Sequence, residues 1–353
     1  MSNVVSTSTP SKPPKRATIK DVAAEAGVSV AAVSKVLRNA YGVSDQMRQR
    51  VELAIDKLSY RPRTGARTMR GSSQTIGLVL TDFASPFQFE VAEAIASRLS
   101  RTDYQDILTI AGTSPQGYRR RIDALVDLQV DGIVLISPRL GMSALSHFAR
   151  TTPLVTVALH GEPKLFDTVV TDERLGARLM VDHLVSLGHE WIAHTTMPVS
   201  SVEDSYQLSQ TMRRQGFIEA MDSHGLVPDI IETYYSEAGG RSAAKRALAR
   251  KHRPTALFAG TDAVAFGALD YLEEQGLHIP QDISVAGYDN VHTSGLRRVS
   301  LTTVDQSGKQ TGEAAIELLL ERIGGRSEAS LRVIEPALVT RTTTAPPPQQ
   351  RSR

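Results

Sequence analysis

Residues 18–37, TIKDVAAEAGVSVAAVSKVL, decide the fold of the N-terminal part of the chain. Thr18 is a predicted helix N-cap, Gly27 ends the helix that follows, and Ser29 is the N-cap of a second helix over residues 30–37. The first helix carries apolar side chains at the 0, 3, 4 and 7 spacing of a buried face, at Ile19, Val22, Ala23 and Ala26. A helix, a glycine turn and a second helix are typical of a helix-turn-helix motif.

A third helix is predicted after Ser44, and the segment as a whole is basic. The first 70 residues hold 13 Lys and Arg and 5 Asp and Glu, a net charge of +8, whereas the whole chain holds 40 and 38. The remainder therefore carries 27 basic and 33 acidic side chains, a net charge of −6. A small basic head on a mildly acidic body indicates a polyanionic partner for the head alone.

Length and composition exclude several classes of protein. At ~150 residues per domain, 353 residues suggest two or three domains. The absence of cysteine removes thiol catalysis, thiolate zinc sites and disulfides. No apolar run approaches the ~20 residues that span a bilayer, and the polar N-terminus is unlike an export signal. We therefore expect a cytoplasmic protein.

From Gln74 onward, short β-rich runs alternate with amphipathic helices. Such alternation over most of a chain predicts parallel, doubly wound sheets covered on both faces, and the number of strands suits two sheets. A ligand would bind in the crevice between the two halves, at the carboxyl ends of the strands. The predicted strands are 76–80, 107–111, 132–136, 154–159, 168–170, 191–196, 231–235, 256–259 and 283–286, and the clearest helices are 87–99, 174–187, 212–224 and 264–275.

Enzyme motifs are missing from this body. The sequence has no G-x-G-x-x-G, no P-loop and no G-x-S-x-G. His189-Glu190 and His194 resemble a zinc-binding helix, but the second histidine is one residue too far along for both imidazoles to share a helix face. We therefore expect no metal and no cofactor, although catalytic residues need not be close in sequence.

The head closely resembles the DNA-binding head of the lac repressor family of bacterial transcription regulators, and landmarks of that family recur in order through the body. The matching segments are Thr18–Ala23, Ala26–Ser29, Val33–Leu37, Val43-Ser44, Tyr60–Pro62, Ile76–Val79, Val130–Ile133, His183-Leu184, Leu187–His189, Ile279–Val285, Gly287–Asp289 and Leu301–Val304. The resemblance covers roughly residues 16–341. It implies a small all-α helix-turn-helix head and an α/β body of two lobes, similar to periplasmic sugar-binding proteins.

For the head, the resemblance implies that the N-terminal half of the second helix enters the major groove of DNA. Val30 and Ala31 can contact thymine methyl groups, and the polar readout of bases would come from Ser34, Lys35 and Arg38. Phosphate contacts are expected from three further residues, Thr18, Ser29 and Asn39.

A hinge at residues 62–73 is expected to become helical on the operator. Arg67 lies in this basic segment, and Met69 stands where relatives insert an apolar side chain into the minor groove. The alternative is an inert basic linker.

For the body, the resemblance implies a two-lobed clamp that binds a small effector. The candidate effector-binding residues are Asp82, Phe87, Asp172, Arg213, Tyr235, Asp262 and Asp289. Carboxylates and an arginine fork can each hold two neighbouring hydroxyls, and an aromatic face can cover the apolar side of a sugar ring, although this set would also suit a purine. Any one of the acidic residues could instead be a helix N-cap, as Asp262 suggests. This chain departs from the family in having Glu173 and Thr261 where Asn is common.

The predicted function is that of a sequence-specific transcription regulator, a repressor, that binds a pseudo-palindromic operator as a homodimer. A small-molecule effector, most simply a sugar, would control operator affinity, with a purine corepressor as the alternative. Two more distant alternatives are a solute-binding protein and an enzyme body fused to a DNA-binding head. The expected divisions are a flexible leader at 1–15, the head at 16–61, the hinge at 62–73, the body at 74–341 and a flexible tail at 342–353.

Overall fold

The computed structural model describes residues 17–37, 40–60, 72–83, 85–198 and 207–348. Two compact units make up the chain, Met1–Ser73 and Gln74–Arg353, referred to here as the head and the body. The predicted leader and most of the predicted hinge, including Arg67 and Met69, lie outside the described residues, as do Arg38 and Asn39.

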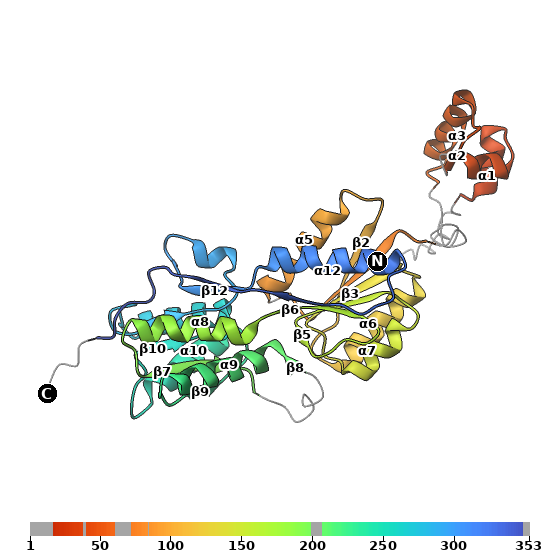
Figure 1. Ribbon diagram of the computed structural model, residues 1–353. Coiled ribbons are helices and arrows are strands. Elements are labelled where there is room, and N and C mark those ends of the chain that lie inside the picture. Colours follow the sequence, from red (N-terminus) through yellow and green to blue (C-terminus); the bar gives the residue numbers. More distant parts are fainter. Residues whose placement is uncertain (1–16, 38–39, 61–71, 84, 199–206, 349–353) are drawn as a thin grey trace, which may run out of the picture. The chain divides into compact units, whose positions relative to one another are not determined.

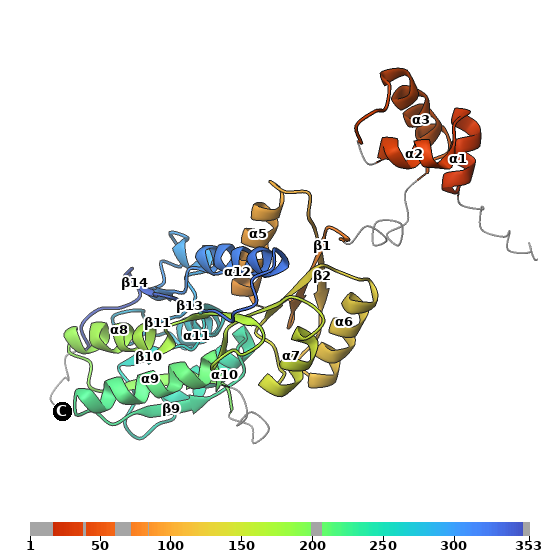
Figure 2. The same ribbon diagram turned by 45° about the vertical axis from the view of Figure 1, so that its right-hand side comes forward.

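The described residues of the head form a bundle of three helices, α1 (Ile19–Ala26), α2 (Val30–Leu37) and α3 (Asp45–Lys57), as Figure 2 shows. Thr18 and Asp21 form a capping box at the start of α1, and Gly27 ends that helix with the positive φ of 62° that glycine adopts without strain. Val22, Val33 and Val51, one from each helix, are completely buried together. The predicted helix-turn-helix is confirmed.

The first lobe of the body contains a parallel six-stranded sheet in the order β13-β6-β4-β3-β1-β2 (Figure 1). The strands are β1 (Thr75–Leu80), β2 (Gln105–Ile110), β3 (Gly132–Ile136), β4 (Leu154–Val157), β6 (Asp167–Thr171) and β13 (Leu331–Ile334). One face packs against α5 (Pro86–Leu99) and α12 (Gly308–Ile323), and the other against α6 (Pro115–Asp127) and α7 (Met142–Ala149). Burial on both faces explains the nearly continuous apolar runs in the inner strands β1, β3 and β4.

The second lobe contains a parallel four-stranded sheet in the order β11-β10-β7-β9. Its strands are β7 (Ile192–Thr196), β9 (Asp229–Glu232), β10 (Ala256–Phe258) and β11 (Ser284–Ala286). Side chains alternate between the faces: Phe258 packs with α8 (Glu173–Ser186) and α9 (Ser209–Ser223), and Leu257 packs with α10 (Glu237–Leu248) and α11 (Asp262–Glu274). Two doubly wound lobes are therefore confirmed.

The chain passes between the lobes at three places: between β6 and α8, between β12 (Thr303–Asp305) and α12, and between β13 and β14 (Ala337–Val339). A short antiparallel pair, β5 (Leu159–His160) with β8 (Gln207–Leu208), adds a further connection. Leu208, next to the second-lobe helix α9, is 2% exposed within the core of the first lobe. Leu208 therefore connects the second lobe to the core of the first. A short 3₁₀ helix, η2 (His292–Gly295), completes the body.

Some predicted boundaries were wrong. The strand expected over 154–159 is interrupted at Ala158, whose φ is +60°, and continues as β5. The strand expected over 231–235 is β9, which ends at Glu232, so Tyr234 and Tyr235 lie in the loop that leads to α10.

The prediction of a flexible tail was wrong for residues 342–348. The Thr343 carbonyl accepts a hydrogen bond from the Val285 N–H at 2.9 Å, and the Thr343 hydroxyl accepts one from the Thr302 N–H at 2.9 Å. A Ser284 hydroxyl and a ring nitrogen of His189 both contact the Ala345 carbonyl. This segment is polar because it bonds to the second lobe through its backbone and hydroxyls.

Among the described residues, no helix is long and apolar enough to cross a membrane.

Candidate functional sites

The N-terminal half of α2 is the exposed surface of the head that was predicted to contact bases. The Ser29 hydroxyl accepts the Ala32 N–H at 3.1 Å and so caps the helix. Val30 is 40% exposed, Ala31 and Lys35 are also exposed, and Ser34 is half-buried. Thr18 lies exposed at the start of α1. The start of α2 therefore exposes an apolar patch that is followed by a cation.

In the body, a cleft lies where the carboxyl ends of both sheets meet. In each sheet the strand order reverses beside a central strand, β1 in the first lobe and β7 in the second. Ligands of doubly wound folds bind at such reversals. A cavity of about 250 Å³ lies there, and its walls come from the segments that follow β1, β3, β7, β9 and β10.

Five of the seven predicted effector-binding residues line this cavity: Asp82, Phe87, Arg213, Tyr235 and Asp289. They come from both lobes and from positions more than 200 residues apart. Sequence reasoning missed further lining residues, among them Gln88, Arg139, Tyr234 and Gln306. Arg139 could have been found, because it follows β3, a strand that ends at the same edge of the sheet as β1.

Asp172 and Asp262 do not line the cavity, and their placement in it was wrong. Asp172 is the N-cap of α8, where its carboxylate accepts the Leu175 N–H at 2.9 Å, and it faces a separate hollow between α8 and α9. The side chain of Asp262 is fully buried and accepts hydrogen bonds from the Val291 N–H and from the hydroxyls of Ser294 and Thr303. Asp262 therefore joins α11 to η2 and to the first residue of β12, and Thr261 is the N-cap of α11.

Arg213, on α9, is held by an ion pair, a hydrogen bond to the backbone and an aromatic ring. Its Nε and Nη2 donate to the same oxygen of Glu173, at 3.0 and 2.9 Å, and Nη1 donates to the Gly260 carbonyl. The guanidinium carbon lies 3.5 Å from the centre of the Tyr288 ring. The side chains of Arg213 and Glu173 are 3% and 0% exposed. The ion pair fixes the orientation of the guanidinium at the cavity wall.

Asp289 lies after β11 with a φ of 126°, a conformation that non-glycine residues rarely adopt. Its carboxyl accepts a hydrogen bond from the Gln306 amide. Burial, with the nearby Asp262 charge, raises the pKa of Asp289 well above its usual value, and Arg213 only partly offsets this increase. Asp289 can therefore act as a hydrogen-bond donor as well as an acceptor toward a ligand.

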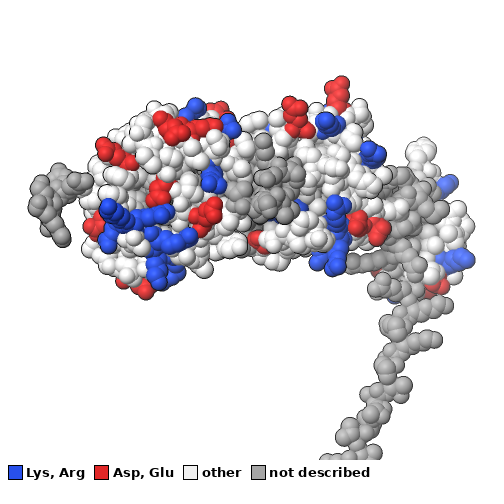
Figure 3. Space-filling view, turned by 90° about the horizontal axis from the view of Figure 1, so that it is seen from below, with Lys and Arg blue, Asp and Glu red and all other residues white. Residues whose placement is uncertain are grey.

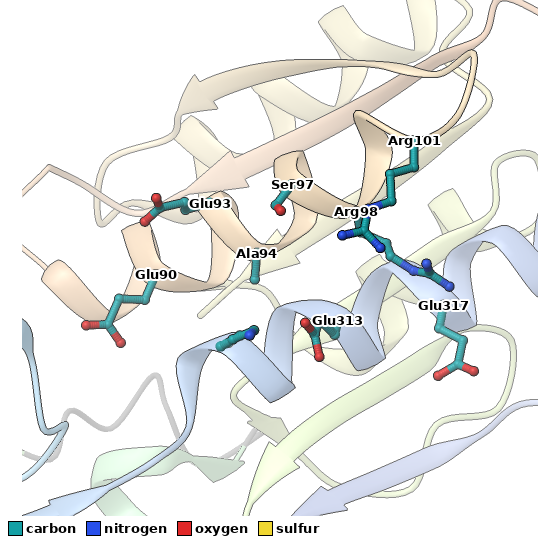
Figure 4. A pocket seen from close by; sticks show the side chains of 9 residues that line it. Glu90, Glu93, Ala94, Ser97, Arg98, Arg101, Glu313 and Glu317 are labelled. Carbon is teal, nitrogen blue, oxygen red and sulfur yellow. The ribbon is translucent and has the colours of Figure 1, made fainter.

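A second, larger hollow of about 640 Å³ lies on the outer surface of the first lobe, between α5 and α12. Figure 4 shows Glu90 and Glu93 toward one end of α5 and Arg98 and Arg101 toward the other, with Glu313 and Glu317 on α12. This groove is lined by charged side chains and lacks the aromatic residues of the cleft. It lies away from the strand ends, so the cleft is the better effector site.

Comparisons with known proteins find relatives for both units of the chain. The pattern described as "Bacterial regulatory proteins, lacI family" matches residues 18–63, and that of a periplasmic binding protein-like domain matches residues 181–344. The HTH-type transcriptional repressor PurR of Pasteurella multocida is 32% identical over 332 residues, 92% of this chain and 98% of the relative. The chain belongs to the LacI family. PurR of Klebsiella pneumoniae is 33% identical over 341 residues, 94% of this chain and 98% of that protein.

Solved structures of this family share the fold over most of the chain. The lac repressor dimer bound to operator and the anti-inducer ONPF has a TM-score of 0.80 at 27% identity, covering 94% of this chain and 100% of that one. A LacI-family regulator from Enterococcus faecium with bound ribose has a TM-score of 0.69 at 27% identity, covering 77% and 99%. This LacI-family protein is a DNA-binding transcriptional repressor controlled by a small-molecule effector, and it is not an enzyme.

Proposed function

We propose that the effector is a carbohydrate or carbohydrate derivative bound in the cleft between the lobes. The observation that carries this proposal is the convergence of Arg213, Asp289 and Gln306 with the aromatic rings of Phe87 and Tyr235 around one cavity. The polar groups can bind neighbouring hydroxyls, and the rings can cover the apolar face of a sugar. A purine acting as a corepressor is the alternative, because the same groups could bind ring nitrogens and stack on a base.

A thermal-shift screen against pentoses, hexoses, disaccharides, polyols and purines tests this proposal. A ligand at ~100 times its Kd adds ~2.7 kcal/mol to stability. We expect a sugar or polyol to raise the Tm, and Asp289→Asn to remove most of that increase, because it changes the donor and acceptor pattern at the cavity wall. Arg178→Ala, at an exposed position in the hollow between α8 and α9, is the matched control. Binding of purines alone would favour the corepressor alternative.

In the head, we propose that Val30, Ala31, Ser34 and Lys35 read bases, with Arg38, while Thr18, Ser29 and Asn39 contact phosphates. The exposure of the start of α2 and the excess of basic residues in the head support this assignment. On the face of the body in Figure 3, by contrast, basic groups lie among acidic ones. Arg67 and Met69 would act in the hinge.

Lys35→Ala tests the base-reading surface. We expect specific operator affinity to fall by ~1–3 kcal/mol, because the substitution removes a charged donor to base edges. Lys57→Ala is the control, since Lys57 is already paired with Glu25 at 2.7 Å in the head. Titrations against operator and random DNA at several salt concentrations provide the measurement. Equal losses on both DNAs would reassign Lys35 to phosphate contact.

We also propose that the repressor acts in the cytoplasm, where its DNA lies, as a homodimer. The edge strand β2 supports a dimer, because its apolar residues Ile107 and Leu108 are 39% and 40% exposed. Two heads would then bind two half-sites of a pseudo-palindromic operator. Sedimentation equilibrium of the protein and of Ile107→Lys tests the proposal. A monomeric mass for the unmodified chain at micromolar concentration would contradict it.

A further inference from the structure

An ion pair at the wall of the cavity, between Arg213 and Glu173 behind it, bears on the charge of the ligand. Glu173 is the first residue of α8, and its carboxylate neutralises Arg213 through two hydrogen bonds to a single oxygen. Because both side chains are almost completely buried, water weakens their interaction little.

The charged groups around the cavity do not favour an anion. Asp82 and Asp289 line it together with Arg139 and Arg213, and Glu173 lies directly behind Arg213. Because the raised pKa of Asp289 favours its uncharged form, the carboxylates of Asp82 and Glu173 balance the two guanidiniums, and no net positive charge remains for an anion. His160, which contacts the Ser209 hydroxyl at the cleft, adds no positive charge, because burial lowers its pKa. A phosphate monoester would bring a further charge of about −1.5 to −2.

The hydrogen-bond donors that remain on Arg213 suit neutral oxygens. A guanidinium has five N–H donors, and the contacts to Glu173 and Gly260 use three of them. The two that remain belong to the terminal nitrogens and can donate to ligand hydroxyls or ring oxygens. They cannot supply the uncompensated positive charge that a buried phosphate requires.

We propose that Glu173 selects an uncharged effector and excludes phosphorylated sugars and nucleotides from the cleft. Glu173 acts as a positioning and specificity residue through Arg213, without touching the ligand. This inference rests on the proposed function in placing the effector in the cleft, but its central claim concerns the charge of Arg213 and can be tested without knowledge of the effector.

The first experiment compares neutral compounds with their phosphate esters on the full-length protein by calorimetric titration: ribose with ribose 5-phosphate, glucose with glucose 6-phosphate, and adenosine with its monophosphate. In every pair that binds, we expect the ester to bind at least tenfold more weakly. An ester that binds as tightly as its neutral partner overturns the proposal. If no neutral compound in any class binds, the carbohydrate proposal fails, and the second experiment alone decides the role of Glu173.

The second experiment uses inorganic phosphate as the probe and Glu173→Gln as the variant. Phosphate, compared with chloride at the same ionic strength, should raise the Tm of this variant by several degrees more than that of the unmodified protein. Glu219→Gln is the matched control, because Glu219 pairs with the exposed Arg174 at 3.3 Å on the neighbouring surface. The basic head is the same in all three proteins, so any binding of phosphate to the head contributes equally to their Tm shifts and does not affect the comparison.

Equal phosphate responses of the unmodified protein and Glu173→Gln overturn the proposal. If Glu173→Gln does not fold, Glu173→Asn replaces it, since that change also removes the carboxylate that neutralises Arg213. A phosphate-dependent rise in the Tm of Glu173→Asn supports the charge argument, and no rise overturns it. Arg213→Met combined with Glu173→Gln should lose the phosphate response, which places the binding at this guanidinium.

Discussion

At the scale of single residues, buried polar groups in this repressor are placed by partners that are distant in the sequence. Arg213 and Asp289 could be predicted as site residues because each belongs to a recognisable family segment. Glu173 could be seen as unusual, but its contact with Arg213 depends on the packing of α8 against α9. Asp262 was wrongly placed because an acidic residue at a strand-to-helix turn has the same local pattern whether it faces a ligand or the core.

His194 leads to a pH prediction. Its ring stacks on Phe217 at 4.9 Å and lies 4.6 Å from Phe258, and its Nδ1 contacts the Phe258 carbonyl at 3.0 Å. Complete burial lowers its pKa to about 3. Unfolded histidine titrates near ~6.5, so the unfolded state binds the proton more tightly and stability falls as pH falls below that value. Between pH 7 and pH 5 this group should cost ~2 kcal/mol.

Urea unfolding of the protein and of His194→Gln at both pH values measures this effect. The variant should be less stable at pH 7 but should lose ~2 kcal/mol less on acidification. His252→Gln is the control, because that ring is exposed and stacks on Trp191. Parallel pH dependence in all three proteins would show that His194 is not the group responsible.

At the scale of elements, the sequence predicts the helices and strands whose own residues carry a recognisable pattern. Short β-rich runs located all nine body strands that were predicted, and the caps at Thr18, Ser29 and Ser44 located the helices of the head. The two-residue strands β5 and β8 carry too little pattern to be recognised, although Leu208 is buried in the first lobe through their pairing. The polar tail was missed because backbone pairing to another element leaves no periodic signal.

Truncation tests the role of the tail. A chain that ends at Arg341 loses the partners of the Val285 and Thr302 N–H groups and of His189. At ~1 kcal/mol for each of three hydrogen bonds, we expect a loss of about 3 kcal/mol. A chain that ends at Pro348 keeps these contacts and should match the full-length protein. Urea unfolding compares the three chains, and equal stability for the shortest would contradict the assigned contacts.

At the scale of the whole molecule, the family implies two sites that influence each other: operator at the head and effector in the cleft. The lobes are joined by three chain crossings and by Leu208, so a ligand that favours one lobe arrangement changes the population of states that bind the operator. An inducer would favour the arrangement with lower operator affinity, and a corepressor the other. The effector can shift operator affinity only by as much as its own affinities for the two arrangements differ.

This coupling predicts a reciprocal measurement. If saturating effector changes operator affinity by a given factor, typically ~5–150-fold, saturating operator must change effector affinity by the same factor. Fluorescence titrations of labelled operator with and without effector, and calorimetric titrations of effector with and without operator, give the two factors. If the second ligand lowers the affinity for the first in both titrations, the effector is an inducer. If it raises the affinity in both, the effector is a corepressor. Because linkage is a thermodynamic necessity for binding at equilibrium, unequal factors would mean that the effector also binds elsewhere, and the groove between α5 and α12 would be the next site to examine.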